Sequence, residues 1–169
     1  MCNEEWLPIV DEKGNIIGKA TRRECHQGSM LLHPVVHLHV LNQNNELFLQ
    51  KRPMNKDVQP GKWDTAVGGH VDWGEEIETS LKREAFEEIG LKDFLFQQVV
   101  IYKWESPIEN ELVYSFITKN YNNLSINKNE LDDGKFWPIA TIEKKFGEHI
   151  FTPNFEAEFK FLKPILSGF

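Results

Sequence analysis

Residues 69–91, GHVDWGEEIETSLKREAFEEIGL, are the stretch of this sequence that decides the fold. The apolar residues Leu81, Ala85 and Ile89 recur at the spacing of one helix face, which predicts a helix over residues 76–89 that packs against a sheet. Gly90 follows directly, and glycine suits the left-handed position at which helices end. A helix bounded in this way is the best-defined local element of the chain.

An acidic arc lies beside the apolar stripe of this helix. Glu84, Glu87 and Glu88 are three and four residues apart, so they share one side of the helix. Their repulsion costs a few tenths of a kcal/mol per pair, and a hard divalent cation would remove it because Mg²⁺ favours carboxylate oxygens. Arg83 could hold one carboxylate through charge-assisted hydrogen bonds. A solvated acidic face is the alternative, and it is the usual one for a bare E-x-x-E-E pattern.

The flanking residues favour the metal site over the solvated face. The segment fits the pattern G-x5-E-x7-R-E-U-x-E-E-x-G-U, in which U is apolar, at every fixed position, and so it resembles the signature of the Nudix superfamily. The matching residues are Gly69, Glu75, Arg83, Glu84, Ala85, Glu87, Glu88, Gly90 and Leu91.

The resemblance implies a fold, a cofactor and a reaction. The expected fold is of the α+β class, a Nudix-like α/β/α sandwich with a mixed sheet between helices, in a single domain over residues 1–169 with an N-terminal hairpin extension over residues 1–30. The expected cofactor is Mg²⁺ or Mn²⁺, which assists the attack of water on a diphosphate. Glu84, Glu87 and Glu88 would bind metal together with the Gly68 carbonyl, and Arg83 would orient them.

The proton of the attacking water needs a base, and the sequence leaves its identity open. Glu87 and Glu88 are candidates on the helix, and Glu111 is the candidate outside it for base or metal work.

A second resemblance, from about residue 26 to residue 116, is to the branch of the superfamily that contains isopentenyl-diphosphate isomerase. It implies a second metal site formed by His26, His33 and His70 with the acidic residues Glu109 and Glu111. It also implies basic residues near a diphosphate, for which Arg52, Lys56 and Lys62 are the candidates.

One departure from this branch favours hydrolysis over isomerisation. The isomerase needs a cysteine directly before Gly69, where this chain has Gly68, and a glycine has no side chain to carry a proton. The cysteines, Cys2 and Cys25, lie far away in sequence. Two alternatives stay open, namely an isomerase-like activity and a non-catalytic sensor that binds a nucleotide.

Other polar and aromatic residues have competing interpretations. His37 and His39 share a predicted strand face with His33, and they are either ligands or ordinary polar residues beneath a helix. Trp104, expected in a loop beside Glu109 and Glu111, could stack on a nucleobase of the substrate or simply pack.

The rest of the chain reads as short strands joined by turns. A hairpin over residues 6–18 precedes a helical turn at residues 21–26. A strand at residues 33–41 is followed by a return strand at 47–51 and an extended segment at 63–71 that the two glycines interrupt. Further strands are expected at residues 94–103, 111–119 and about 136–139, with a closing helix at 155–166.

Composition limits the partners. The chain has 169 residues and a formal net charge of −7, which argues against binding of nucleic-acid polymers or membrane surfaces. Six glutamates lie in residues 75–88, and four basic residues lie in residues 51–62. Two cysteines and the lack of a signal-like or spanning apolar run indicate a cytoplasmic protein. The expected partner is a small-molecule diphosphate, and a homodimer is left open.

Overall fold

The N-terminal part of the chain forms the expected hairpin and helical turn. The computed structural model describes residues 4–169, so Cys2 lies outside the described residues. Strands β1 (Trp6–Val10) and β2 (Ile16–Thr21) pair antiparallel, and α1 (Arg22–Cys25) follows at once. Thr21 caps α1 and Glu24 completes the capping box, which satisfies the free N–H groups at the start of the helix.

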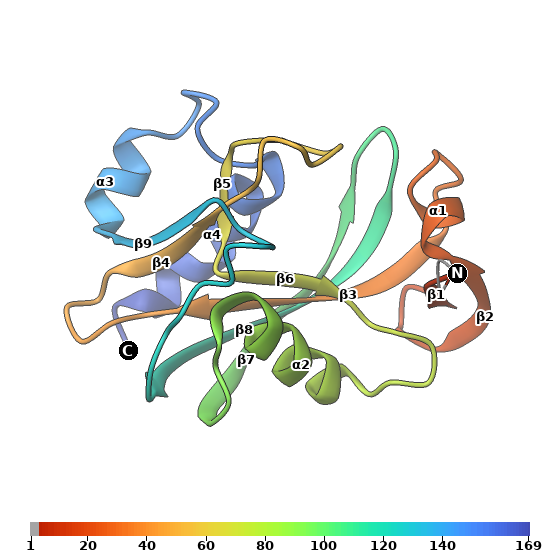
Figure 1. Ribbon diagram of the computed structural model, residues 1–169, viewed down its shortest axis with the longest axis horizontal. Helices are drawn as coiled ribbons and strands as arrows, with labels where there is room; N and C mark the ends of the chain where they lie inside the picture. Colours follow the sequence, from red (N-terminus) through yellow and green to blue (C-terminus); the bar gives the residue numbers. More distant parts are fainter. Residues whose placement is uncertain (1–3) are drawn as a thin grey trace.

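The central sheet contains four strands in the order β6-β3-β8-β7 (Figure 1). They are β3 (Leu32–Val40), β6 (Val67–His70), β7 (Phe94–Glu105) and β8 (Asn110–Tyr121). Strand β3 runs parallel to β8 and antiparallel to β6, while β7 is antiparallel to β8. The predicted mixed sheet is therefore confirmed.

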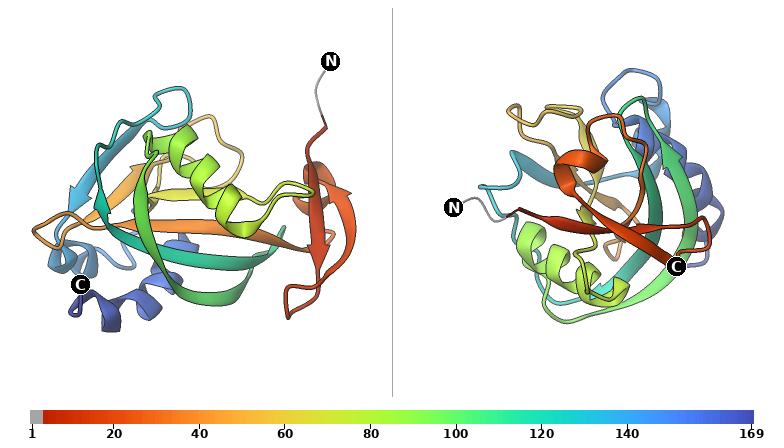
Figure 2. Two further views of the ribbon diagram at one scale, coloured as in Figure 1. Left: turned by 90° about the horizontal axis from the view of Figure 1, so that it is seen from below. Right: turned by 90° about the vertical axis from the view of Figure 1, so that its right-hand side faces the viewer.

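Helices cover both faces of this sheet, as Figure 2 shows in its left view. Helix α2 (Ile77–Ile89) lies on one face and α4 (Pro153–Leu166) on the other. The predicted stripe of Leu81, Ala85 and Ile89 is fully buried, and Gly90 ends α2 with φ of 69°. Burial of β3 on both faces follows from this sandwich.

A smaller sheet has the order β5-β4-β9, from β4 (Leu47–Lys51), β5 (Trp63–Thr65) and β9 (Asp133–Trp137). The prediction that residues 47–51 return along the preceding strand is wrong. Apart from a bridge between Leu41 and Leu47, β4 pairs with β5 and β9, because β6 and β8 already occupy both edges of β3.

Two other predicted boundaries also differ. The extended segment at residues 63–71 breaks at Ala66, whereas Gly68 and Gly69 lie inside β6 and pair with His37 and Val36. The strand expected at about residues 136–139 ends at Trp137, since the chain turns there into α3 (Ile139–Lys144), a helix that was not predicted from the sequence.

A second core lies under α4, where Phe151, Phe155 and Phe159 pack with residues of the small sheet. Among residues 4–169, no helix has both the length and the apolar character that crossing a membrane requires.

Candidate active site

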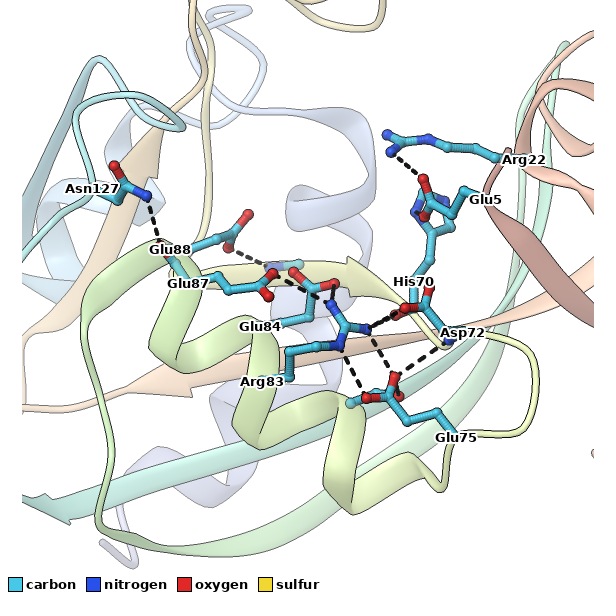
Figure 3. Close-up of polar contacts among 12 residues, drawn as sticks. Glu5, Arg22, His70, Asp72, Glu75, Arg83, Glu84, Glu87, Glu88 and Asn127 are labelled. Carbon is cyan, nitrogen blue, oxygen red and sulfur yellow. Dashed lines mark hydrogen bonds and ion pairs between the residues drawn. The ribbon is translucent and has the colours of Figure 1, made fainter. Parts of the chain in front are cut away.

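A carboxylate cluster lies around Arg83 on α2, and Figure 3 shows Glu75, Glu84 and Glu87 converging on the guanidinium while Glu88 lies beside them. The cluster comprises Asp72, Glu75, Glu84, Glu87 and Glu88. Arg83 Nη1 lies 2.7 Å from Glu84 Oε1 and 3.4 Å from Glu87 Oε2, and Nη2 donates to Glu75 Oε2 at 2.9 Å. Nη2 also donates to the carbonyl of His70 at 3.0 Å, which ties α2 to the end of β6.

The two glycines of β6 let the glutamates approach the sheet. A Cβ at Gly69 would overlap the carboxyl group of Glu84, so only glycine leaves that side chain its place. The N–H of Gly68 donates to Glu88 Oε2 at 3.1 Å, and the amide nitrogen of Gln50 lies 3.1 Å from the same oxygen. The α2 glutamates are thus held against the strand edge at defined positions.

The carboxylate cluster carries more negative charge than its protein partners compensate. Burial, followed by the neighbouring Glu84, raises the pKa of Glu88 to about 8. Burial also raises the pKa of Glu84 to about 7, although the adjacent Arg83 opposes the shift. Oxygen donors with excess negative charge are the ligand set that Mg²⁺ or Mn²⁺ prefers, so these residues fit the expected metal.

An open cavity of about 290 Å³ lies over the cluster. Four of its lining residues, Glu5 before β1, Arg22 on α1, Asp72 after β6 and Glu130 in the loop before β9, were not predicted from the sequence. No spacing rule could have found Arg22, because it reaches the cavity only through docking of the hairpin, in which the N–H of Trp73 donates to the Trp6 carbonyl at 2.8 Å. The full lining is Glu5, Arg22, Asp72, Arg83, Glu84, Glu87, Glu88 and Glu130.

The structure also brings His26, His33 and His70 together, with one ring nitrogen from each within 4.8 Å of the others. The Nε2 atoms of His26 and His70 lie 2.8 Å apart, and His26 Nδ1 lies 2.8 Å from Glu109 Oε2. His33 donates from Nδ1 to the Leu31 carbonyl, while its buried Nε2 has no hydrogen-bond partner within the described residues.

These features fit a second metal. Metal-binding histidines usually have their second nitrogen fixed by a carboxylate or a carbonyl, as His26 and His33 do here. Burial, followed by the charge of Arg22, lowers the pKa of His70 well below its usual value, and burial also lowers the pKa of His33. Both imidazoles are therefore neutral, the form that binds metal.

Glu111 belongs with the histidines rather than with α2, on the face of the sheet that carries His33. Burial, followed by the neighbouring Glu109, raises its pKa to about 7. The loop predicted for Trp104 is wrong, because this residue lies in β7, which extends to Glu105, and pairs with Glu111 across the ladder. Trp104 is half-buried there.

His37 and His39 are bonded to the protein itself. His37 Nδ1 lies 2.7 Å from Glu158 Oε2, and His39 Nε2 lies 2.8 Å from Glu158 Oε1. Glu158 comes from α4, so the two histidines are polar residues bonded beneath a helix, as the second of the two interpretations predicted, although His39 Nδ1 has no hydrogen-bond partner within the described residues. Burial opposes the shift, but the Glu158 carboxylate outweighs it and raises the pKa of His37 to about 9.

The predicted phosphate-binding cations lie near the small sheet, and they differ in how firmly the protein holds their side chains. Arg52 uses its guanidinium to organise the following loop, donating to the Val58 carbonyl at 2.9 Å and to Asp64 at 3.4 Å. Lys56 is exposed, with its Nζ 3.8 Å from a carboxylate oxygen of the cavity residue Glu130. Lys62 directly precedes β5, and its carbonyl accepts from the N–H of Arg52.

Comparison with known proteins decides the family. Residues 31–158 match the NUDIX domain, which is more than half of the chain. The chain belongs to the Nudix family. An uncharacterised Nudix hydrolase of Listeria monocytogenes is 29% identical over 156 residues, covering 90% of each chain. Isopentenyl-diphosphate Delta-isomerase 1 of Photorhabdus laumondii is 29% identical over 163 residues, covering 91% of this chain and 92% of that protein.

Two further similarities complete the comparison. An uncharacterised Nudix hydrolase of Yersinia pestis is 35% identical over 94 residues, and this Nudix chain spans only about half, 51%, of that relative. The crystal structure of DR0079 from Deinococcus radiodurans superposes with a TM-score of 0.72 at 19% identity, covering 85% of this chain and 90% of that one, which shows the shared fold. The family and its hydrolase-named members make this chain a hydrolase that acts on phosphorus-containing anhydrides.

Proposed function

We propose that this Nudix chain hydrolyses a diphosphate linkage in a nucleoside diphosphate derivative or a similar small organic diphosphate, with Mg²⁺ or Mn²⁺ as cofactor. The observation that carries the proposal is the set of three glutamates on α2 at an open cavity, where Glu84 and Glu87 share one arginine and Glu88 is bonded only by neutral donors among the described residues. Such an uncompensated set of oxygen donors suits a divalent cation and the phosphate oxygens that accompany it.

Each residue of the carboxylate cluster has a role in this proposal. Glu84, Glu87 and Glu88 would hold the metal with the carbonyl of Gly68, and Arg83 fixes the orientation of Glu84 and Glu87. When bound, the metal supplies a water of lowered pKa and neutralises phosphate oxygens. Glu87, Glu88 or Glu111 would accept the proton of the attacking water.

Cations on α1 and near the small sheet hold the substrate. Arg22 lines the cavity opposite α2, where its guanidinium pairs with Glu5 at 3.0 Å and about half of its side chain is exposed, so it is available to a phosphate group. Arg52, Lys56 and Lys62 hold further phosphate oxygens, and Trp104 contacts the organic group. We also propose that residues 1–169 act as a single domain in the cytoplasm, on a small molecule rather than on a nucleic-acid polymer.

An isomerase-like activity is the second candidate, favoured by the histidine cluster. His26, His33 and His70, with Glu109 and Glu111, would hold a second metal as in the isomerase branch. Gly68 argues against this candidate, since it occupies the position of the isomerase cysteine. Cys25 does not replace that cysteine, because it is buried among Leu7, Ile9 and Ala20, and burial raises the pKa of its thiol to about 11.

The test is phosphate or nucleotide release from a panel of organic diphosphates with Mg²⁺ or Mn²⁺. Wild type should release product, Glu87→Gln should lose most of that rate, and Glu78→Gln should retain it, because Glu78 is exposed on the same helix outside the cavity. Tight ligand binding without release from any compound would instead support the sensor. Double-bond migration in isopentenyl diphosphate would support the isomerase.

A further inference from the structure

Gln50 lies in β4 of the small sheet, yet its side chain reaches the carboxylate cluster on α2. The residue is 5% exposed. Its amide nitrogen is 3.1 Å from Glu88 Oε2 and 3.4 Å from the carbonyl oxygen of Ala66, the residue between β5 and β6. A single amide group therefore joins the small sheet, the break between β5 and β6, and the last turn of α2.

Both donors to Glu88 meet at the same oxygen. The N–H of Gly68 and the amide of Gln50 each lie 3.1 Å from Oε2, and no protein donor is recorded at Oε1 within residues 4–169. Two donors from different directions stop rotation of the carboxylate about its last bond. They hold Oε2 against the protein and leave Oε1 for a cation.

The chemistry of an amide suits this position. A lysine or arginine at position 50 would place a full positive charge beside the Glu88 carboxylate and reduce the excess negative charge of the cluster. The amide of Gln50 fixes the carboxylate without neutralising it, so the demand for a cation is preserved. The competing role is purely structural, in which Gln50 serves to satisfy the Ala66 carbonyl and Glu88 is a bystander.

We infer that Gln50 is a positioning residue of the metal site, which orients the Glu88 carboxylate so that Oε1 is presented to a divalent cation. This inference rests on the proposed function, because it assumes that the α2 glutamates bind metal. It predicts that substitution of Gln50 lowers metal affinity only when the Glu88 carboxylate is present.

The experiment is a double-mutant cycle read by calorimetric titration of Mg²⁺. Gln50→Met keeps the length of the side chain and removes the donor, and it should weaken Mg²⁺ binding by about tenfold, the usual cost of losing a partner of a metal ligand. In a Glu88→Gln background the same change should alter the affinity less than twofold. Gln98→Met, at an exposed position on β7, is the matched control and should bind Mg²⁺ like wild type.

Each outcome decides the inference. Equal affinity of Gln50→Met and wild type would overturn it, and so would a tenfold loss that persists in the Glu88→Gln background, since that loss would be general and structural. If Gln50→Met does not fold, Gln50→Asn withdraws the donor by one methylene and carries the same expectation. Absence of Mg²⁺ binding in wild type would overturn the proposed function itself, a result distinct from an unchanged variant.

Discussion

The glutamates of the carboxylate cluster on α2 and the buried Glu158 on α4 have pKa values that their surroundings shift in opposite directions. Glu84 shares one arginine with three other acids, Glu88 is bonded by the neutral donors of Gly68 and Gln50, and burial and repulsion raise the pKa values of both glutamates. Glu158 is fully buried with a histidine on each of its oxygens, and those two histidines outweigh burial and hold its pKa well below the usual value.

This difference distinguishes the carboxylate cluster, a candidate binding site, from Glu158 and its histidines, which have a structural role. Both carboxylate oxygens of Glu158 are paired with histidines and need no further ligand, as a buried charge must be if it is to be tolerated. The carboxylate cluster has unmet demand for positive charge beside an open cavity. Of these two groups of charges, only the second has a reason to bind a cation.

Substitution within the carboxylate cluster should produce the largest effect. Glu88→Gln keeps the shape of the side chain but removes a metal-binding charge and a candidate base. We expect kcat for release from the active diphosphate to fall by about 10²–10⁴-fold, measured at saturating Mg²⁺. Retention of full turnover would mean that the catalytic charge lies elsewhere.

The equivalent change in the buried group should affect stability instead. Glu158→Gln leaves the buried His37 without its counter-charge, and breaking such a pair costs about 3–5 kcal/mol of unfolding free energy. Urea denaturation measures this loss, with Glu156→Gln on the same helix as the control. Mg²⁺ affinity below the unfolding transition should equal that of wild type, and a weakened affinity would show that the two groups are coupled.

Two adjacent glycines sharpen the contrast at the strand edge. Gly69→Ala places a Cβ against the Glu84 carboxyl, and such overpacking costs about 1–3 kcal/mol. Because Glu84 must move, Mg²⁺ affinity should fall as well. In Gly68→Ala the new Cβ would lie 3.5 Å from His37 in ordinary contact, so that variant should stay close to wild type in both measurements. Equal behaviour of the two variants would contradict the placement of Glu84.

The smallest effect is the pH dependence contributed by His37. Its pKa rises from 6.5 to about 9 on folding, so its pairing with Glu158 stabilises the fold fully below pH 6.5 and is lost as pH rises towards 9. The lowered pKa of Glu158 adds stability above pH 4.5 that is lost in acid. The difference in unfolding free energy between wild type and His37→Phe should therefore shrink between pH 6.5 and 9. A constant difference would mean that His37 is neutral in the fold.

The sequence predicted the parts that depend on local rules. Helix α2, its buried stripe and its glycine end follow from helical periodicity, and the hairpin follows from alternation and turn residues. The convergence of Glu84, Glu87 and Glu88 also follows, because one helix carries all three.

What the sequence could not predict depends on distant segments. The predicted pairing of β4 with β3 was wrong because strands from later in the chain pair with both edges of β3. Glu158 lies 121 residues from His37, so no local pattern joins them. Gln50 and Arg22 likewise reach the carboxylate cluster only through tertiary packing, and a single glutamine or arginine carries no spacing signal.

The most direct test of the central claim is calorimetric titration of Mg²⁺ into wild type and Glu84→Gln/Glu88→Gln. Mg²⁺ is the probe because it prefers carboxylate oxygens to the imidazole nitrogens of the histidine cluster, so its binding reports on the carboxylate cluster. We predict a saturable site in wild type that the double variant loses, while Glu158→Gln still binds. Equal Mg²⁺ binding by wild type and the double variant would show that the carboxylate cluster is not the metal site.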